Sequence, residues 1–401
     1  MRFAIVTLGC KVNHYEGQRI RQGLLHAGHC EQPFSEPGAD VYIINTCTVT
    51  HKADADGRRL IRRALGSGGR VIVTGCQAGV YPDDIRKVSR EVEVVRPENL
   101  SEVLDIDLPR FISEFGSQNR AFVKVQQGCD RYCTYCIVPM ARGAPVSRPW
   151  QDVVTEVRTL VAGGYHEVVL TGINIGLYRG GLTRLIQKIL GHTAISRVRV
   201  SSMEPWTVED CLIDMAAHEP RVCAHLHLPL QHGSDRVLRA MGRPYTAEAV
   251  RSLVARIRDT SPSMAIGADV IVGFPGEDER AFEESYALIE GMDITYLHVF
   301  TFSPRPGTVA ASLQDRPGSG AVRQRSSFLR ELSRSKRREF AASRIGSVEE
   351  VLVTGSRCGG FSGISSNYLT VTTRGDAAPG SLVKVRLVGH DGSTLQGELL
   401  G

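Results

Sequence analysis

Short apolar runs alternate with helix-length amphipathic segments along most of this 401-residue chain. In residues 1–108 the apolar runs are Phe3–Leu8, Val41–Asn45 and Arg70–Thr74, and helical segments lie between them at Tyr15–Ala27 and Lys52–Leu65. Alternation of this kind is typical of βαβ units, whose strands form a parallel sheet. The pattern predicts an α/β fold that begins with a parallel α/β domain.

A longer alternation follows a connector at residues 109–119. Between residues 115 and 344, six apolar runs predict strands: Ala121–Val125, Val168–Leu170, Val198–Val200, Ala224–Leu228, Ala268–Val272 and Tyr296–Phe302. The segments between them predict helices: Val153–Ala162, Leu182–Leu190, Val208–Ala217, Ala247–Arg258 and Ala281–Ile289. This region is too short for an eight-unit barrel, which needs about 250 residues, and it fits a partial (β/α)6 barrel.

The last part of the chain is first basic and then rich in short strands. Residues 316–344 hold nine Lys/Arg and two acidic residues, a formal charge of +7, and predict a helix over Val322–Ala342. Such a basic segment indicates either a polyanion partner or a solvated helix face. Between residues 345 and 401, the runs Glu350–Thr354, Tyr368–Thr373 and Leu382–Val388 are separated by Gly-rich turns, which predicts a small all-β barrel of the OB type.

The composition bears on the cellular compartment. No apolar run reaches the roughly 18 residues of a membrane span, and Phe3–Leu8 is too short for the apolar core of a signal peptide. We therefore expect a cytoplasmic protein with no membrane partner. Its ten cysteines are then kept reduced, which favours metal binding or catalysis over disulfides. The cysteines without ligand spacing, for which we expect no function, are Cys30, Cys211, Cys223 and Cys358.

Three cysteines lie within eight residues, directly after the first strand of the predicted barrel. Cys129, Cys133 and Cys136 are separated by three and two residues. Three thiolates on one tight loop can bind three irons of a [4Fe–4S] cluster, whereas a structural zinc site needs a fourth nearby ligand that this segment lacks. With Tyr135 before the last cysteine, the motif resembles that of the radical S-adenosylmethionine (SAM) superfamily. The resemblance implies that the fourth iron binds SAM.

A second set of cysteines is scattered in sequence but regular in position. Cys10, Cys47 and Cys76 each follow one of the three predicted strands of the N-terminal domain. Because parallel strands end at one edge of a sheet, the three thiols can converge there. Topology alone leaves open both a second cluster and three buried, half-apolar cysteines.

Motifs along essentially the whole chain resemble those of the radical SAM methylthiotransferases. They are Gly9–Glu16, Asn45–Cys47, Thr74–Cys76, Leu228–Asp235, Asp269–Glu277 and Phe302–Thr308. Residues 345–401 resemble the TRAM domain of that family, which implies tRNA binding. Within the family, the sequence Lys-Val-Asn-His-Tyr-Glu at Lys11–Glu16 most resembles the bacterial members that act on N6-threonylcarbamoyladenosine.

The resemblance implies a reaction, its cofactors and its partners. Cys10, Cys47 and Cys76 would bind an auxiliary [4Fe–4S] cluster that carries or receives the sulfur, which makes two clusters in all. One SAM methylates the sulfur, and a second yields the radical that removes hydrogen from C2 of the adenine next to the anticodon, at position 37. The partners would be the tRNA anticodon stem-loop and a low-potential electron donor of the flavodoxin or ferredoxin type, while the sulfur source is left open.

Candidates for binding SAM lie at the ends of predicted strands. They are Glu204 after the third barrel strand, Gln231 and Ser234 after the fourth, and Gly273 and Gly276 after the fifth. Ser234 suits helix capping equally well. Many radical SAM enzymes end their second strand with Gly-Gly-Glu, but here the sequence is Thr171-Gly172-Ile173-Asn174. The group that contacts the SAM amino group is therefore left open.

Candidates for binding the substrate are mostly basic. On the basic helix they are Arg334, Lys336, Arg337 and Arg338, and on the C-terminal barrel Arg357, Phe361, Tyr368, Arg374, Lys384 and Arg386, although some of these aromatics must fill its core. The candidates for binding the carboxylate of a threonylcarbamoyl group are Arg142, Arg148, Arg243 and Arg305. Arg142 and Arg148 can equally anchor the loop after the cluster cysteines. His225 and His227 face one side of a strand and suit a metal pair, barrel packing or substrate contact.

Together these features predict a tRNA methylthiotransferase. Within this class, the alternatives are methylthiolation of N6-isopentenyladenosine in tRNA or of an aspartate in a ribosomal protein. An alternative of a different class is a non-catalytic iron–sulfur protein that binds RNA. The intact cysteines of both sets argue against that alternative.

Overall fold

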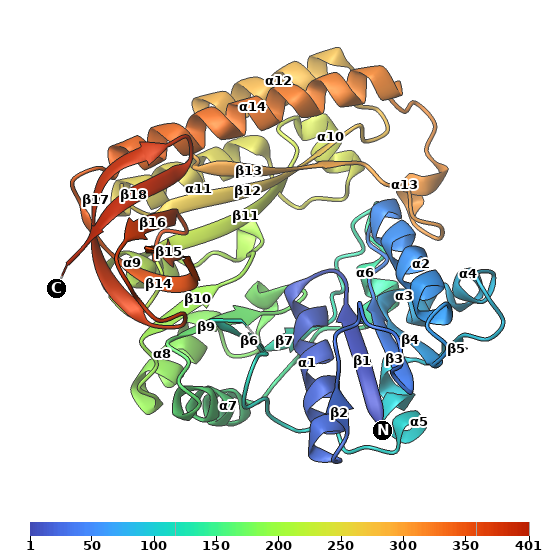
Figure 1. Ribbon diagram of the computed structural model, residues 1–401. Coiled ribbons are helices and arrows are strands. Elements are labelled where there is room, and N and C mark those ends of the chain that lie inside the picture. Colours follow the sequence, from blue (N-terminus) through green and yellow to red (C-terminus); the bar gives the residue numbers. More distant parts are fainter. Residues whose placement is uncertain (117, 358, 401) are drawn as a thin grey trace.

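The computed structural model describes residues 1–116, 118–357 and 359–400 (Figure 1). It confirms the predicted α/β class, with parallel sheets followed by a small closed β-barrel. Cys358, for which we expect no function, lies outside the described residues, as does the side chain of Arg357. None of the described helices is long and apolar enough to cross a membrane.

Five parallel strands form the N-terminal sheet in the order β2-β1-β3-β4-β5. The central strands are the three predicted ones, β1 (Arg2–Thr7), β3 (Val41–Thr46) and β4 (Arg70–Gly75), and the short strands β2 (Cys30–Glu31) and β5 (Glu93–Val94) lie at the edges. Apolar side chains of α2 pack on one face of the sheet, and those of α1 and α5 pack on the other. The helices are α1 (Lys11–His26), α2 (His51–Leu65), α3 (Cys76–Val80), α4 (Pro82–Arg86), η1 (Pro97–Asn99) and α5 (Leu100–Leu104).

Six parallel strands form the central partial barrel, as the alternating pattern predicts. They are β6 (Ala121–Lys124), β9 (Glu167–Thr171), β10 (Arg197–Val200), β11 (His225–Gln231), β12 (Ala265–Val272) and β13 (Tyr296–Thr301). They pair as β10-β9-β6 and β11-β12-β13, and a bridge from Val198 to Val222 joins the two halves. Five helices pack their apolar side chains on the outer face: α7 (Trp150–Ala162), α8 (Leu182–His192), α9 (Asp210–His218), α11 (Ala247–Thr260) and α12 (Glu279–Gly291).

Short elements fill the connections that follow the barrel strands, at the end where such barrels hold their active sites. They are β7 (Gln126–Gln127), α6 (Val138–Arg142), β8 (Val146–Ser147), η2 (Ile175–Leu177), η3 (Pro205–Thr207), α10 (Asp235–Ala240) and α13 (Val309–Ser312).

A long helix leads from the central barrel into the C-terminal domain. α14 (Ser319–Ser343) packs along β13 and α12, as the orange helix in Figure 1 shows. The domain is a closed barrel of β14 (Val348–Arg357), β15 (Gly360–Ser365), β16 (Thr370–Arg374), β18 (Thr394–Leu399) and β17 (Leu382–Asp391), in that spatial order. The runs that predict strands omit β15 and β18, which contain glycines and so have a low strand propensity.

Glu167 joins the C-terminal barrel to the central one. This carboxylate is fully buried at the start of β9 and forms ion pairs with Arg197 (2.6 Å) and Arg199 (2.8 Å) on β10. Arg199 also donates to the backbone carbonyls of Ser365 (3.1 Å) and Ser366 (2.9 Å) in the C-terminal barrel. The two barrels therefore share a buried charged interface.

Candidate active site

Cys129, Cys133 and Cys136 lie on a loop between β7 and α6. Gly128 begins the loop with φ +77°, and a Cβ there would lie 2.0 Å from the carbonyl oxygen of Ala144, so only glycine fits. The backbone N–H of Cys136 donates to the carbonyl of Cys133 (2.9 Å), which closes a tight turn. Burial raises the pKa of Cys136 to about 12, and the neighbouring Cys133 and Cys129 thiols act in the same direction. The three thiols thus form one group.

Arg243 connects this cysteine group to Glu204. Its Nη1 donates to Sγ of Cys133 (3.2 Å), its Nη2 pairs with the Glu204 carboxylate, and its guanidinium lies 5.1 Å from the ring centre of Trp206. Burial raises the pKa of Glu204, while Arg243 acts in the opposite direction. The structure therefore places Glu204, one of the candidates for SAM, next to the cysteine loop. No sequence pattern predicts that Arg243 pairs with Glu204, because the two residues lie 39 positions apart.

The other candidates for SAM engage groups of the protein. Gln231 ends β11 with φ +65°. The hydroxyl of Ser234 donates to Glu284 (2.6 Å) and makes no capping bond to α10. The backbone N–H of Gly273 donates to Glu277 (2.8 Å), and that of Gly276 to the carbonyl of Asp315 (2.9 Å). Both glycines have φ +83° and so build the turn after β12.

Asn174 is the polar residue at the end of the second barrel strand. It is 3% exposed, and neither Nδ2 nor Oδ1 of its amide has a hydrogen-bond partner among the described residues. Buried amide groups without partners are costly, so the site suits a ligand that both donates and accepts. An amino acid group with its ammonium and carboxylate offers both. β9 pairs directly with β6, which leads into the cysteine loop, so Asn174 and the three thiols lie at one edge of the barrel.

Cys10, Cys47 and Cys76 lie at the carboxyl ends of β1, β3 and β4, as their positions in the sequence predict. Burial raises the pKa of the Cys76 thiol to about 12, and the nearby thiols of Cys47 and Cys10 add to this effect. Two glycines allow the strand ends that carry these cysteines to lie close together. A Cβ on Gly9 (φ +100°) would lie 2.6 Å from Cβ of Cys47, and a Cβ on Gly75 (φ +90°) would lie 2.4 Å from the carbonyl oxygen of Thr46.

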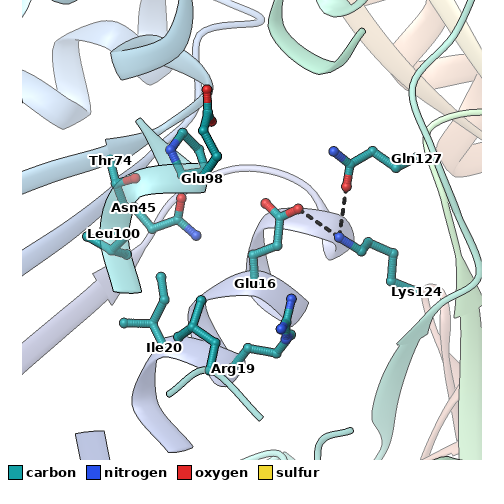
Figure 2. Close-up of a pocket in the computed structure, with 11 residues that line it drawn as sticks. Glu16, Arg19, Ile20, Asn45, Thr74, Glu98, Leu100, Lys124 and Gln127 are labelled. Carbon is teal, nitrogen blue, oxygen red and sulfur yellow. Dashed lines mark hydrogen bonds and ion pairs between the residues drawn. The ribbon is translucent and has the colours of Figure 1, made fainter. Parts of the chain in front are cut away.

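Arg142, the last residue of α6, follows the loop of the first cysteine group and contacts a cysteine of the second. Its Nε donates to Sγ of Cys76 (3.2 Å), and its Nη1 pairs with Glu16 (2.7 Å). Lys124 completes the arrangement with an ion pair to Glu16 (3.0 Å). Figure 2 shows Glu16 and Lys124 on the wall of a cavity of about 230 Å³ between the N-terminal domain and the barrel.

The four arginines expected near a threonylcarbamoyl carboxylate all form ion pairs with the protein. Arg142 pairs with Glu16 and Arg243 with Glu204. Arg148 pairs with Glu156 (2.5 Å) and Arg305 with Asp54 (2.7 Å). Arg142 and Arg148 both hold the segment after the cysteine loop against the N-terminal domain, which is the anchoring alternative that the sequence left open.

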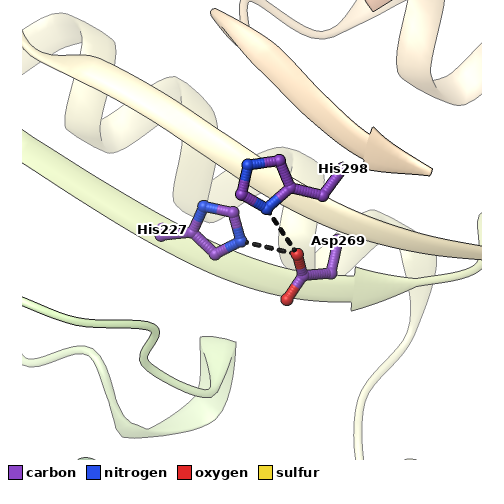
Figure 3. Close-up of side chains that lie close together, drawn as sticks. All are labelled: His227, Asp269 and His298. Carbon is purple, nitrogen blue, oxygen red and sulfur yellow. Dashed lines mark hydrogen bonds and ion pairs between the residues drawn. The ribbon is translucent and has the colours of Figure 1, made fainter. Parts of the chain in front are cut away.

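His225 and His227 face the interior of the barrel, since the alternating Leu226 and Leu228 pack outward against the helices. Figure 3 shows His227 and His298 on either side of Asp269, whose Oδ1 accepts from His227 Nε2 (2.8 Å) and His298 Nδ1 (3.2 Å). The Tyr296 hydroxyl lies 2.9 Å from His225 Nε2 and 3.1 Å from His227 Nδ1. The interior is therefore lined by a hydrogen-bonded network of polar groups.

The residues expected to bind RNA on α14 point in different directions. Arg334 and Arg338 are exposed, and both lie near Glu331. Lys336 instead donates to the backbone carbonyls of Glu290 and Met292, and the Arg337 guanidinium lies over the ring of Tyr296. Two basic residues that the sequence did not single out, Arg323 and Arg330, are exposed at positions that continue the line of Arg334 and Arg338.

On the C-terminal barrel, the two candidate aromatics do not form an exposed stacking surface. Phe361 is buried in the core of that barrel, and Tyr368 stacks on His225 with ring centres 4.6 Å apart. Arg374, Lys384 and Arg386 are exposed.

Comparisons with known proteins agree with this geometry. Residues 123–289 match the Radical SAM superfamily, and residues 2–96 match a family described as Uncharacterized protein family UPF0004. The chain is 34% identical to the threonylcarbamoyladenosine tRNA methylthiotransferase MtaB of Bacillus subtilis, over 96% of this chain and 93% of that protein. The chain belongs to the radical SAM tRNA methylthiotransferases.

Other members of this methylthiotransferase family are equally similar. The tRNA-2-methylthio-N(6)-dimethylallyladenosine synthase of Alkalilimnicola ehrlichii is also 34% identical, over 100% of this chain and 98% of that protein. Among solved structures, the radical SAM methyltransferase TsrM from Kitasatospora setae has the same fold, with a TM-score of 0.57, 16% identity and 77% of each chain covered. Membership of the radical SAM superfamily implies that this methylthiotransferase uses SAM and a [4Fe–4S] cluster.

Proposed function

We propose that this chain is the methylthiotransferase that modifies C2 of N6-threonylcarbamoyladenosine next to the anticodon. We further propose two [4Fe–4S] clusters, one bound by Cys129, Cys133 and Cys136 and the other by Cys10, Cys47 and Cys76. The observation that supports the proposal is the placement of the cysteines: Cys10, Cys47 and Cys76 follow the carboxyl ends of three neighbouring parallel strands, and Cys129, Cys133 and Cys136 share one loop.

When bound, the clusters and SAM supply the electron, the radical and the sulfur. The residues of the chain bind and orient these groups. Asn174 has a free amide donor and acceptor for the amino acid part of SAM. Arg243 holds Cys133 and Glu204 in place. The Glu204 carboxylate has further lone pairs, which can accept hydrogen bonds from the ribose hydroxyls of SAM.

Three observations support the threonylcarbamoyl substrate. Three of the similar relatives, from Bacillus subtilis, Chlamydia pneumoniae and Aquifex aeolicus, carry that substrate in their names. The sequence Lys11–Glu16 resembles that group. The barrel interior near Glu204 presents polar side chains, including His227, Asp269 and His298, which suit a substituent with a urea and a carboxylate. The name of the relative from Alkalilimnicola ehrlichii supports N6-isopentenyladenosine as the second candidate substrate.

A competition assay tests the substrate. The reconstituted protein is given equal amounts of two anticodon stem-loops, one with N6-threonylcarbamoyladenosine and one with N6-isopentenyladenosine. We expect the first to be methylthiolated and the second rejected, since an apolar tail leaves buried polar groups unpaired at about 1–3 kcal/mol each. Mass spectrometry of the nucleosides reads the result. Equal modification, or preference for the isopentenyl form, contradicts the threonylcarbamoyl assignment.

The number of clusters is tested by iron analysis. We expect about eight irons per chain, four for each cluster. Replacing Cys129, Cys133 and Cys136 by Ala should remove about half of the iron and all reductive cleavage of SAM. Replacing Cys10, Cys47 and Cys76 should remove the other half and all methylthiolation, and leave some cleavage. Full iron and full methylthiolation in the second variant would show that the auxiliary site is wrongly assigned. We also propose a flavodoxin- or ferredoxin-type electron donor for the reductive step.

A further inference from the structure

Arg142 belongs to the segment of one cysteine group and contacts a cysteine of the other. It lies six residues after Cys136, at the end of the short helix α6. Its Nε–H points at Sγ of Cys76, with an N···S distance of 3.2 Å. This is a direct N–H···S contact from a cation to one of the three thiols of the auxiliary site.

The guanidinium is held in this position from three sides. Its Nη1 lies 2.7 Å from both carboxylate oxygens of Glu16, and its Nη2 donates to Oδ1 of Asn13. Glu16 is itself held by Lys124 at 3.0 Å. The Arg142 side chain is only 5% exposed. Each of its three nitrogens therefore has a partner, which suits a fixed structural charge.

A fixed N–H donor at a ligating sulfur changes the electronic balance of an iron–sulfur cluster. The hydrogen bond and the positive charge draw electron density from the thiolate, so the more negative, reduced state is stabilised relative to the oxidised state. The effect is strong here because the contact is shielded from water. The reduction potential of a cluster on Cys76 is therefore raised by Arg142.

We propose that Arg142 is a positioning residue that raises the reduction potential of the cluster bound by Cys10, Cys47 and Cys76. The inference rests on the auxiliary cluster of the proposed function. Because α6 follows the Cys133–Cys136 turn directly, the same contact also holds the auxiliary site at a fixed place relative to the loop of Cys129, Cys133 and Cys136.

The test uses the full-length chain with Cys129, Cys133 and Cys136 replaced by Ala, so that only the auxiliary cluster remains after anaerobic reconstitution. Its midpoint potential is measured by redox titration followed by electron paramagnetic resonance. In this background we compare Arg142→Gln, which removes the charge, and Arg142→Lys, which keeps the charge but cannot bridge Glu16 and Cys76 as the planar guanidinium does. Arg110→Gln is the control, because Arg110 is exposed, pairs with Asp152 (2.8 Å) and has no cysteine contact among the described residues.

We expect the midpoint potential to become more negative in Arg142→Gln, to shift less in Arg142→Lys and to stay unchanged in Arg110→Gln. Unchanged potentials in both Arg142 variants overturn the inference. Loss of the iron from both variants also overturns it, since Arg142 would then be needed for holding the cluster. If the parent chain with intact Arg142 binds no iron, the auxiliary site of the proposed function has failed, and this result is distinct from the others.

Discussion

The hydroxyl of Tyr15 donates a hydrogen bond to Glu156 across 141 positions of the chain, with an O···O distance of 2.8 Å. Tyr15 lies on α1 of the N-terminal domain, and Glu156 lies on α7 of the central barrel. The Glu156 carboxylate is fully buried and also accepts from the Ile112 backbone (2.9 Å) and Arg148 (2.5 Å). One carboxylate therefore joins the domain of the second cysteine group to the barrel.

Loss of this charge should destabilise the protein strongly. Glu156→Gln leaves Arg148 buried without its counter-ion, and we expect the free energy of unfolding to fall by about 3–5 kcal/mol. Tyr15→Phe removes two hydrogen bonds, the one to Glu156 and the one that Arg148 Nη1 donates to the Tyr15 hydroxyl (3.2 Å), and should cost about 1–3 kcal/mol. Urea unfolding measures both. Asp152→Asn, on the same helix, breaks only the exposed pair with Arg110 and should change the stability by less than about 1 kcal/mol.

The ion pairs of Glu167 with Arg197 and Arg199 predict that the free energy of unfolding depends on pH. Burial alone would raise the pKa of Glu167, but Arg199 and Arg197 outweigh it and hold the pKa at about 2, below the ordinary 4.5. As the pH falls, Glu167 is therefore protonated at a higher pH in the unfolded chain than in the folded protein. The contribution of Glu167 to stability is complete above pH 4.5 and is lost as the pH falls toward 2.

The matching variant is Glu167→Gln. Near pH 7 its free energy of unfolding should be lower than that of the wild type by about 3–5 kcal/mol, because Arg197, Arg199 and Arg120 lose their counter-ion. The difference between the two proteins should shrink below pH 4.5. A difference that stays constant between pH 7 and pH 3 would show that the carboxylate does not titrate as the ion pairs require.

The exposed arginines of α14 predict how tRNA affinity depends on salt. Four of them, Arg323, Arg330, Arg334 and Arg338, form one basic stripe on the surface of the helix. Replacing them with Gln should reduce the slope of log affinity against log salt by about 0.7–0.9 for each lost phosphate contact. The double variant Lys336→Gln, Arg337→Gln is the control, because these two side chains face the protein and should leave the slope unchanged. Equal slopes for the wild type and the stripe variant would show that the stripe is only a solvated face.

The backbone conformation of Gly75 predicts that a substitution there disrupts the site of Cys10, Cys47 and Cys76 and leaves the other cysteine site intact. With φ +90° and ψ −161° this residue adopts a conformation that is essentially restricted to glycine. In Gly75→Ala the new Cβ would also collide with Thr46 and Asn45, so Cys76 must move. We expect about half of the iron to be lost, with SAM cleavage retained. Gly68→Ala has a similar φ of +83° but open space around the Cβ, and it should keep all the iron.

Elements formed by local periodicity were well predicted from the sequence. The three central strands of the first sheet and the six strands of the barrel follow from apolar runs that repeat between amphipathic segments. The very short strands β2 and β5 and the glycine-containing strands β15 and β18 do not stand out, because packing and pairing with neighbours create them. The positions of Cys10, Cys47 and Cys76 in the sequence were also enough to place each of them at the carboxyl end of one of three neighbouring parallel strands.

The partners of the charged residues were decided only by the tertiary structure. The spacing of Arg142, Arg148, Arg243 and Arg305 indicates cations near a barrel mouth, but their counter-ions Glu16, Glu156, Glu204 and Asp54 lie between 8 and 251 positions away. Likewise, helix periodicity cannot tell whether Lys336 faces solvent until α14 is placed on β13.

The sequence by itself determined the α/β fold class and, through motifs that resemble those of the methylthiotransferases, the protein family, because motifs and strand–helix alternation are local properties that the covalent chain carries directly. Only the tertiary structure decided that Arg142 contacts Cys76 and that the buried side-chain amide of Asn174 has no hydrogen-bond partner in the part of the chain that the structure describes. The physical reason is that a buried charge or amide takes whichever partner the packed domains bring within hydrogen-bond distance, and that choice is not encoded in the distance along the chain.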